Sequence, residues 1–199
     1  MHKVFSMKKN DTQIVREILG GDMRQFALIM DRYMKPLYGF IFRLVGDDSV
    51  AEDICQDVFI RVWKNMETFD ARKKFSTWIF AIAKNAAFDY LKKKKSLPFT
   101  FFKGEEGTNI LEYIEDEKVL DSLAILGKID NEKALSVFLQ ELPPKSRSIL
   151  LLYHSQGFSL AEVAEIFGSS QNTIKSIYRR SILALREKLL SQQEVIESR

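Results

Sequence analysis

Polar and basic side chains of the kinds that contact DNA gather near the C-terminal end of this 199-residue chain. Glutamine and asparagine can form paired hydrogen bonds with adenine, and arginine can do so with guanine. Lysine, serine and threonine suit the phosphates of the DNA backbone. The candidate DNA-contacting residues are Ser169, Ser170, Gln171, Asn172, Thr173, Lys175, Ser176, Arg179 and Arg180.

Two short helices must present these side chains. The string FSLAEVAEIFGSSQNTIKSIYRRS predicts one helix over 159–167 and a second over 170–190. Ser159 and Glu162 have the spacing of a capping box at the start of the first helix. Gly168 ends that helix, because glycine adopts a positive φ at no steric cost. The pattern favours a helix-turn-helix whose second helix enters the major groove.

The second of these helices has an apolar face and a basic face. Ile174, Tyr178 and Leu185 are spaced to point towards a core. Residues 171–188 contain five basic side chains and one acidic side chain, a net charge of +4. Ile177 places a large apolar group next to the presumed DNA-facing side. The bland alternative is a packed helix pair with a solvated basic face, and we favour DNA binding over it.

The rest of the sequence also indicates helices, and no stretch has the period-2 alternation of a strand. Asp11 and Asp22 are suited to cap helices, and Gly20 can end the first of them. Pro36 predicts a kink. We therefore expect an all-α fold of two small helical domains. Outside the helix-turn-helix the expected helices span 11–19, 26–45, 49–66, 76–95 and 144–155.

Charge is unevenly distributed along the chain. Residues 96–130 contain three lysines and eight acidic residues, a net charge of −5. Because the whole chain carries +3, the remainder carries +8. The segment 96–130 predicts an acidic linker, with a short helix around 110–126.

Little in the sequence indicates an enzyme. His2 and His154 lie far apart, and no Cys/His cluster suits zinc, so we expect no catalytic residue, metal or cofactor. Cys55 sits in a helical pattern and predicts a packed thiol. The N-terminus lacks the apolar region of a signal peptide, and no apolar run spans a membrane. We expect a cytoplasmic protein without membrane contacts.

Three strings carry a family resemblance. ELPPKSRSILLLYHSQGFSLAEVAEIFGSSQNTIKSIYRRSILALREKL resembles the promoter-reading C-terminal domain of sigma factors of the sigma-70 family, above all the extracytoplasmic-function (ECF, group IV) type. AEDICQDVFIRVWKN (51–65) resembles the family's core-polymerase-binding helix. FSTWIFAIAKNAAFDYLKKKK (75–95) resembles its promoter-melting helix. Two departures are Ile177 and Ile182, which stand where family members often carry arginine.

The resemblance implies an order of domains along the chain. It implies an N-terminal segment (1–21), a sigma region 2 domain for polymerase binding and the −10 element (22–95), and the acidic linker (96–130). A sigma region 4 helix-turn-helix domain for the −35 element (131–190) and a C-terminal tail (191–199) follow.

The resemblance also implies a polymerase-binding surface. Asp53, Gln56 and Asp57 lie along one side of a helix. From their spacing alone, a solvated helix face would be the favoured interpretation. The family assigns such a stripe to the clamp helices of the largest polymerase subunit. The candidate polymerase-binding residues are Asp53, Gln56, Asp57, Ile60 and Trp63.

The −10 element requires a surface for single-stranded DNA. Aromatic stacking beside a basic track can hold a single strand, and a pocket can capture a flipped base. The resemblance implies that loop 69–74 and Asn85 frame that base. Trp78 suits core packing equally well. The candidate residues are Phe69, Asp70, Arg72, Lys73, Lys74, Phe75, Ser76, Trp78, Lys84, Asn85, Lys92 and Lys93.

The implied partners are the bacterial RNA polymerase core, through its clamp helices and the flap of the second-largest subunit, and promoter DNA, duplex at −35 and single-stranded at −10. An anti-sigma factor or another recruiter is compatible with the family. The linker is expected to thread the polymerase cleft, so neutralising its acidic side chains should change initiation or escape more than promoter affinity. Two other hypotheses stay open: a stand-alone helix-turn-helix regulator that binds an operator as a dimer, and a module whose basic faces bind protein.

Overall fold

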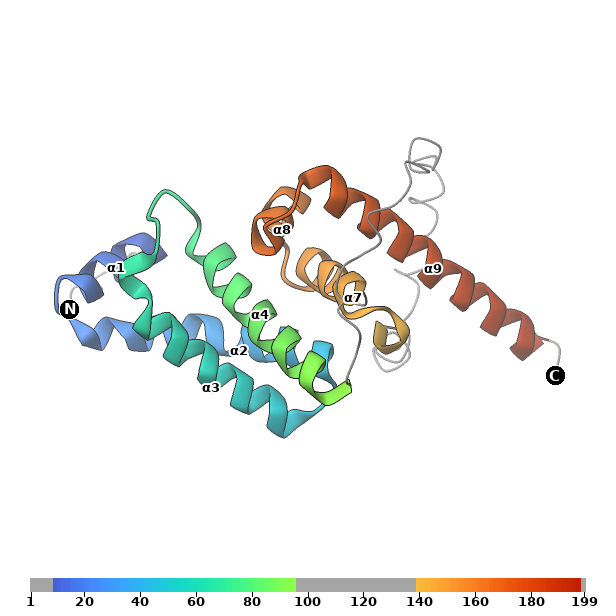
Figure 1. Ribbon diagram of the computed structural model, residues 1–199, viewed down its shortest axis with the longest axis horizontal. Helices are drawn as coiled ribbons and strands as arrows, with labels where there is room; N and C mark the ends of the chain where they lie inside the picture. The colour runs from blue at the N-terminus through green and yellow to red at the C-terminus, as the bar shows by residue number, and fades with distance from the viewer. Residues whose placement is uncertain (1–8, 96–138, 198–199) are drawn as a thin grey trace, which may run out of the picture.

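The computed structural model describes residues 9–95 and 139–197, and within these ranges it contains helices and no strands (Figure 1). The all-α prediction is confirmed. The N-terminal half consists of α1 (Asp11–Leu19), α2 (Phe26–Val45), α3 (Asp48–Lys64) and α4 (Phe75–Lys95), with short 3₁₀ turns η1 (Met23–Gln25) and η2 (Met66–Thr68). The C-terminal half consists of α7 (Pro144–Leu150), a π-helical turn η5 (Leu151–Ser155), α8 (Leu160–Phe167) and α9 (Gln171–Glu197).

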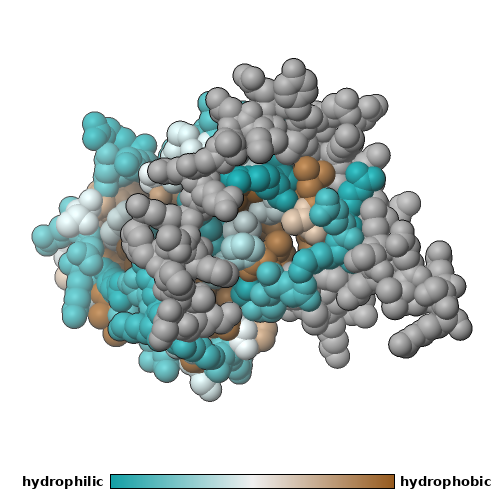
Figure 2. Space-filling model, turned by 45° about the vertical axis from the view of Figure 1, so that its right-hand side comes forward, coloured by the Kyte–Doolittle hydropathy of each residue, from teal (hydrophilic) through white to brown (hydrophobic). Residues whose placement is uncertain are grey.

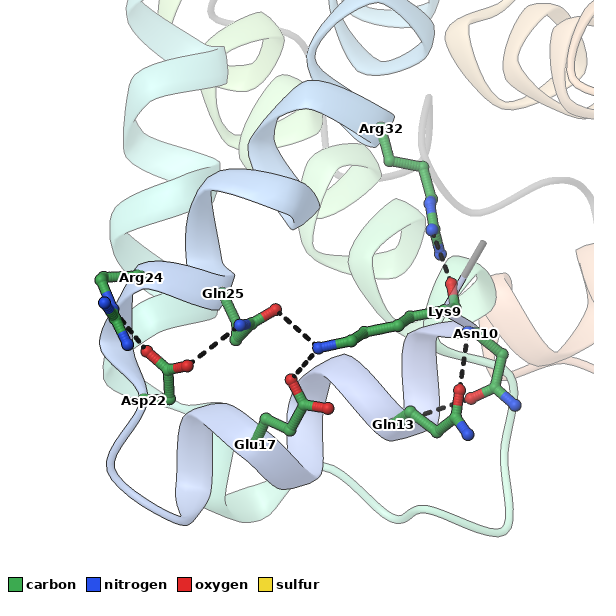
Figure 3. Close-up of polar contacts among 8 residues, drawn as sticks. All are labelled: Lys9, Asn10, Gln13, Glu17, Asp22, Arg24, Gln25 and Arg32. Carbon is green, nitrogen blue, oxygen red and sulfur yellow. Dashed lines mark hydrogen bonds and ion pairs between the residues drawn. The ribbon is translucent and has the colours of Figure 1, made fainter. Parts of the chain in front are cut away.

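The cap of α1 differs from the prediction. Asn10, and not Asp11, caps the helix: its Oδ1 accepts from the amide of Gln13 at 2.8 Å, and the Gln13 side chain accepts from the amide of Asn10 at 3.2 Å (Figure 3). Asp11 is instead the first helical residue. Its carboxylate pairs with Arg32 and accepts from the Tyr33 hydroxyl, so it ties α1 to α2.

Asp22 does not cap the next helix, although its position predicts that it does. It precedes η1, but its side chain makes no cap hydrogen bond there. Its carboxylate accepts instead from Arg24 Nε and Gln25 Nε2, each at 3.0 Å (Figure 3). These bonds hold the bend between α1 and α2 and lower the pKa of Asp22.

The helices of the N-terminal half otherwise begin and end close to the predicted residues. Pro36 lies inside α2, which runs through it to Val45. Gly46 ends α2 in the left-handed region, and Asp47 caps α3 by accepting from the amide of Val50. The expected helix over 49–66 is divided, because α3 ends at Lys64 and η2 follows.

The predicted helix over 144–155 is not a regular α-helix throughout. The α-helical part ends at Leu150, and a π-helical turn follows in which the amide of Gln156 donates to the Leu151 carbonyl at 3.1 Å. The amide of Phe158 reaches the Leu152 carbonyl at 3.1 Å. The π-helical turn redirects the chain so that the Phe158 ring is buried. Helical periodicity alone does not specify this change of direction.

The last helix is longer than predicted. α9 continues past residue 190 to Glu197, since the sequence there contains neither glycine nor proline to end it. The expected linker 96–130, its short helix and the start of the second domain at 131 lie outside the described residues.

The helices enclose one continuous hydrophobic core. In the N-terminal half α2 packs against both α3 and α4, with Leu37, Phe40 and Leu44 fully buried between them. In the C-terminal half α7, α8 and α9 pack together around Ile149 and Ile174. α4 also packs against α8, so the core continues from one half into the other (Figure 1).

Candidate nucleic-acid and polymerase interfaces

The helix-turn-helix is built by the caps that the sequence indicates. Ser159 Oγ accepts from the amide of Glu162 at 3.3 Å, and Glu162 Oε2 accepts from the amide of Ser159 at 2.8 Å. Gly168 ends α8 with φ 60°, a conformation that favours glycine. Ser170 then caps α9, since its Oγ accepts from the amide of Thr173 at 3.1 Å. These contacts fix the angle at which α9 leaves the turn.

The two faces of α9 are cleanly separated. The apolar positions Ile174, Ile177, Tyr178, Ile182 and Leu185 are all buried. Ile177, which the sequence places next to the presumed DNA-facing side, is itself only 6% exposed. Ile177 and Ile182 belong to the core here.

The opposite face of α9 is polar and open. Five of the candidate residues on α9 are exposed, and the candidate residues Ser169, Ser176 and Arg179 are half-buried. In Figure 2 the described residues on the face shown are mostly hydrophilic, with smaller hydrophobic areas between them. The exposed five are Gln171, Asn172, Thr173, Lys175 and Arg180.

The stripe on α3 combines acidic, amide and apolar side chains at the surface. Asp53 and Gln56 are exposed, and the half-buried Asp57 forms an ion pair with Arg61 at 2.7 Å. Ile60 is 52% exposed and Trp63 is 42% exposed, so the stripe includes apolar area that is open to a partner. The five candidate polymerase-binding residues are therefore accessible together on one helix.

Three aromatic rings form a cluster where α4 begins. The rings of Phe69, Phe75 and Trp78 have centroids 5.3 to 5.4 Å apart, and Tyr33 packs edge-on against Phe75. Phe69 and Phe75 are buried, whereas Trp78 is half-buried. In this arrangement Phe69 and Phe75 hold the 69–74 loop against α4, and Trp78 is the ring nearest to the surface.

The 69–74 loop is braced by an ion pair. Arg72 Nε and Nη2 each donate to a different oxygen of Asp70 at 2.9 Å, and the Arg72 amide donates to Asp70 Oδ1 at 3.0 Å. These bonds lower the pKa of Asp70 to about 2. Lys73 and Lys74 follow with exposed side chains, and Lys74 Nζ donates to Glu162 Oε1 on α8 at 2.6 Å.

The remaining candidates on α4 have unequal exposure. Asn85 and Lys93 are exposed, and the half-buried Lys92 lies 4.0 Å from Asp89. Ser76 is half-buried. Lys84, in contrast, is only 8% exposed, and burial lowers its pKa to about 8.

The comparisons with known proteins place this geometry in a family. The Sigma-70 region 2 family matches residues 29–97, and the Sigma-70, region 4 family matches residues 138–187. The ECF RNA polymerase sigma factor SigW of Bacillus subtilis (strain 168) is 32% identical over 177 residues, which is 88% of this chain and 94% of SigW. The chain belongs to the ECF sigma factors of the sigma-70 family.

Another relative and two solved structures are consistent with this assignment. The ECF RNA polymerase sigma factor SigX of the same organism is 28% identical over 86% of this sigma factor and 88% of its own length. Among solved structures, CnrH in complex with the cytosolic domain of CnrY has a TM-score of 0.65 at 19% identity, over 91% of this chain and 97% of that one. The complex of RpoE with the anti-sigma factor NepR from Bartonella quintana has a TM-score of 0.59 at 21% identity, over 83% and 97% of the two chains. Both support the fold.

The functional expectation is therefore confirmed at the level of the family: the protein is a sigma factor, which binds core RNA polymerase and directs it to promoters. No cluster of histidine, cysteine and acidic side chains suited to a metal ion occurs within residues 9–95 and 139–197. None of the helices in the described part of the chain is long and apolar enough to cross a bilayer. Cys55 is buried, and burial raises its pKa to about 11, in keeping with the packed thiol that the sequence predicts.

Sequence reasoning missed Arg147. Its guanidinium is buried and donates to the carbonyls of Leu139, Gln140 and Leu142, and also to Leu44 on α2 at 2.8 Å. Arg147 thereby holds the start of the second half of the sigma factor against the first. An arginine in a helical pattern gives no local signal of such a distant partner.

Proposed function

We propose that this sigma factor, a group IV member acting in the cytoplasm without catalysis of its own, divides promoter recognition between its two helical domains. Region 2, over 22–95, binds core polymerase and opens the −10 element, and region 4, over 131–190, reads the −35 element. The observation that carries the proposal is the pair of accessible surfaces on separate halves: the polar face of α9 and the stripe on α3.

In region 4, α9 is proposed to lie in the major groove at −35. Its first turn, Gln171 to Thr173, has side chains that can reach base edges, while Lys175 and Arg180 are placed one and two turns further along. The caps of α8 and α9 order the intervening turn, so the helix reaches DNA with its orientation already fixed. Arg179→Ala is expected to weaken promoter use.

In region 2, the stripe on α3 is proposed to bind the clamp helices of the largest polymerase subunit. Ile60 and Trp63 offer apolar area at its C-terminal end, and Asp53, Gln56 and Asp57 offer acceptors for basic partner side chains. Asp53→Ala combined with Gln56→Ala should weaken polymerase binding, whereas it should leave DNA contacts of α9 unchanged.

The −10 strand is proposed to run along the 69–74 loop and the exposed side of α4. Lys73 and Lys74 supply positive charge, Trp78 supplies a ring and Asn85 supplies a polar amide near the captured base. Phe69 and Phe75 contribute by holding the loop in place.

Run-off transcription with purified core polymerase tests the proposal. Core polymerase with this protein should start at a defined promoter, and core polymerase alone should not. The isolated protein should bind duplex promoter DNA weakly and with strong dependence on salt, because two weak readers reach specificity only by acting together. A tight, sequence-specific footprint without polymerase would favour the stand-alone regulator instead.

A further inference from the structure

The N-terminal helix α1 lies next to the segment that leads into the 69–74 loop. α1 packs against both α2 and η2, and η2 ends at Thr68, directly before the loop. The amide of Phe69 donates to the Met66 carbonyl at 3.1 Å, so the loop starts from an ordered turn beside α1. α1 itself lies outside the region 2 match, which begins at residue 29.

One guanidinium fixes the start of α1 to α2. Arg32 pairs with the Asp11 carboxylate and donates through Nη2 to the Lys9 carbonyl at 2.8 Å (Figure 3). The capping box of Asn10 and Gln13 orders the same turn. Asp11 is therefore held in place by its neighbours in α1 and by α2, and its negative charge suits the start of a helix.

The other oxygen of this carboxylate binds a buried hydroxyl. The Tyr33 hydroxyl donates to Asp11 Oδ2 at 2.6 Å. Burial and the bond to Asp11 raise the pKa of Tyr33, so its hydroxyl remains a donor at neutral pH. Because a buried hydroxyl without an acceptor is costly, the bond to Asp11 fixes the orientation of the tyrosine side chain.

The ring of Tyr33 in turn supports the aromatic cluster at the loop. Its centroid lies 5.5 Å from that of Phe75, and the ring planes meet at 61°. Phe75 is buried and contacts both Phe69, at the start of the loop, and Trp78, the ring of the cluster nearest to the surface. A shift of Tyr33 would be passed on to these rings, because a close-packed interior leaves little room for independent movement.

The far end of the loop is tied to α4. The Lys74 carbonyl accepts from the Thr77 hydroxyl at 2.8 Å and from the amide of Trp78 at 3.3 Å. Asp70 and Arg72 form their ion pair between the two ends. Since the far end is fixed to α4, the shape of the loop depends on the rings that set the position of its near end.

We infer that Asp11 and Tyr33 are positioning residues for the −10 element: their hydrogen bond sets the Tyr33 ring against Phe75, and this contact holds the 69–74 loop in the shape that captures the unpaired base. Neither residue contacts DNA in this role. The inference rests on the proposed function, because it concerns the same −10 site. It gives the N-terminal helix a part in promoter opening.

Tyr33→Phe is the test variant, because it removes the hydroxyl and keeps the ring. Tyr38→Phe is the matched control. Tyr38 lies on the same helix, and its hydroxyl also donates to a carboxylate, that of Asp48, but its ring stacks on Phe42. Both variants lose one bond from a tyrosine to an aspartate, so a difference in DNA binding between them reports the contact with the cluster.

Binding of a fluorescent single strand by the polymerase holoenzyme gives the first measurement. One strand carries the non-template −10 sequence of a start site mapped after overexpression of the factor, and a second carries the same bases in scrambled order. Tyr33→Phe should weaken binding of the −10 strand roughly fivefold, the equivalent of one ordinary hydrogen bond. Binding of the scrambled strand should change by less than about twofold, because backbone contacts need no captured base. Tyr38→Phe should match wild type on both strands.

The outcomes separate the inference from the proposed function. A wild-type holoenzyme that binds both strands equally would overturn the −10 role of region 2, and the inference with it. A wild type that prefers the −10 strand, together with a Tyr33→Phe variant that keeps the full preference, would overturn the positioning role alone.

A double-mutant cycle assigns the effect to the bond. Asp11→Ala should weaken binding of the −10 strand at least as much as Tyr33→Phe, since it also releases Arg32. If Asp11 acts through the Tyr33 hydroxyl, adding Tyr33→Phe to Asp11→Ala should cost less than about a further twofold. Two effects that multiply in full would show that the residues act independently, contrary to the inference.

Fluorescence of Trp78 gives a readout that needs neither DNA nor polymerase. Trp63 and Trp78 are the two tryptophans of the chain, so a Trp63→Phe background leaves Trp78 as the reporter. In that background Tyr33→Phe should raise the acrylamide quenching constant of Trp78, whereas Tyr38→Phe should leave it unchanged. Equal quenching in all three proteins would mean that the hydroxyl does not position the cluster, and the inference would be overturned.

Discussion

At the scale of single residues, Lys175 is the simplest probe of the α9 face. Its side chain is exposed one turn into the helix, at the point where backbone phosphates are expected. Lys175→Ala should weaken binding of the polymerase holoenzyme to promoters roughly uniformly across sequences and reduce the salt slope by about one. Titrations of labelled promoter DNA at several salt concentrations measure both.

Lys188→Ala is the matched control for that prediction. Lys188 is a basic residue of the same helix, but it forms an ion pair with Glu141, away from the first turns of α9. Its removal should leave the salt slope unchanged. A loss of slope equal to that of Lys175→Ala would mean that the whole helix contributes only a diffuse positive field.

Cys55 gives a prediction about reactivity. Burial raises the pKa of its thiol to about 11, so the thiolate that reacts with maleimides is scarce at neutral pH and also shielded. Native protein should therefore label at least about 100-fold more slowly than denatured protein. An Ala161→Cys variant, whose new thiol is exposed, supplies the reference rate; similar rates for the two thiols would contradict the packing of α3.

At the scale of helices, the cap of α8 predicts an asymmetry between two substitutions. Ser159→Ala removes the oxygen that accepts from the Glu162 amide and should lower the free energy of unfolding by about 1 kcal/mol. Glu162→Gln retains a side-chain acceptor for Ser159 and should cost less than about half of that. Urea unfolding followed by circular dichroism measures both, and equal losses would mean that the box does not stabilise the helix.

The sequence predicted many of the helices because their ends carry local signals. Gly46, Asp47, Ser159 and Gly168 each mark an end whose chemistry involves only neighbouring residues. The cap at Asn10 was displaced by one residue because Asp11 has distant partners in α2. The π-helical turn was not predictable, because it allows Phe158 to pack against α4, and local periodicity carries no information about so distant a contact.

The candidate sites, too, could be predicted only where they depend on residues that are close together in the sequence. The exposed and buried faces of α9 follow from helical spacing, apart from Ile177, whose position near the edge of the apolar face is settled only by packing. The covering of Lys84 by Phe167 joins residues far apart in the chain, so no local pattern could indicate it.

At the scale of the whole molecule, Lys84 makes the stability of the fold sensitive to pH. Burial, with smaller contributions from Lys145 on α7 and from Lys92, lowers its pKa to about 8, against an opposite effect of Asp89. The ring of Phe167 on α8 faces the same ammonium. Unfolding exposes the amine and restores its ordinary pKa, so the unfolded chain binds more protons between about pH 8 and 10. The free energy of unfolding should therefore rise with pH through this window.

Urea unfolding followed by circular dichroism at several pH values measures that dependence. Between pH 7.5 and pH 9.5 the equilibrium constant for folding should rise by up to about 20-fold. Lys84→Met, which keeps the length of the side chain but cannot titrate, should abolish the change. A pH dependence that persists in Lys84→Met would assign the effect to another group.

The length of α9 has a practical consequence. Its 27 residues rise by about 1.5 Å each, so Glu197 lies roughly 40 Å from Gln171 along a single rod that points away from the helix-turn-helix (Figure 1). A fluorescent protein or affinity tag fused beyond this rod would be carried well clear of the promoter. Reporter fusions for following this factor in living cells are best attached there.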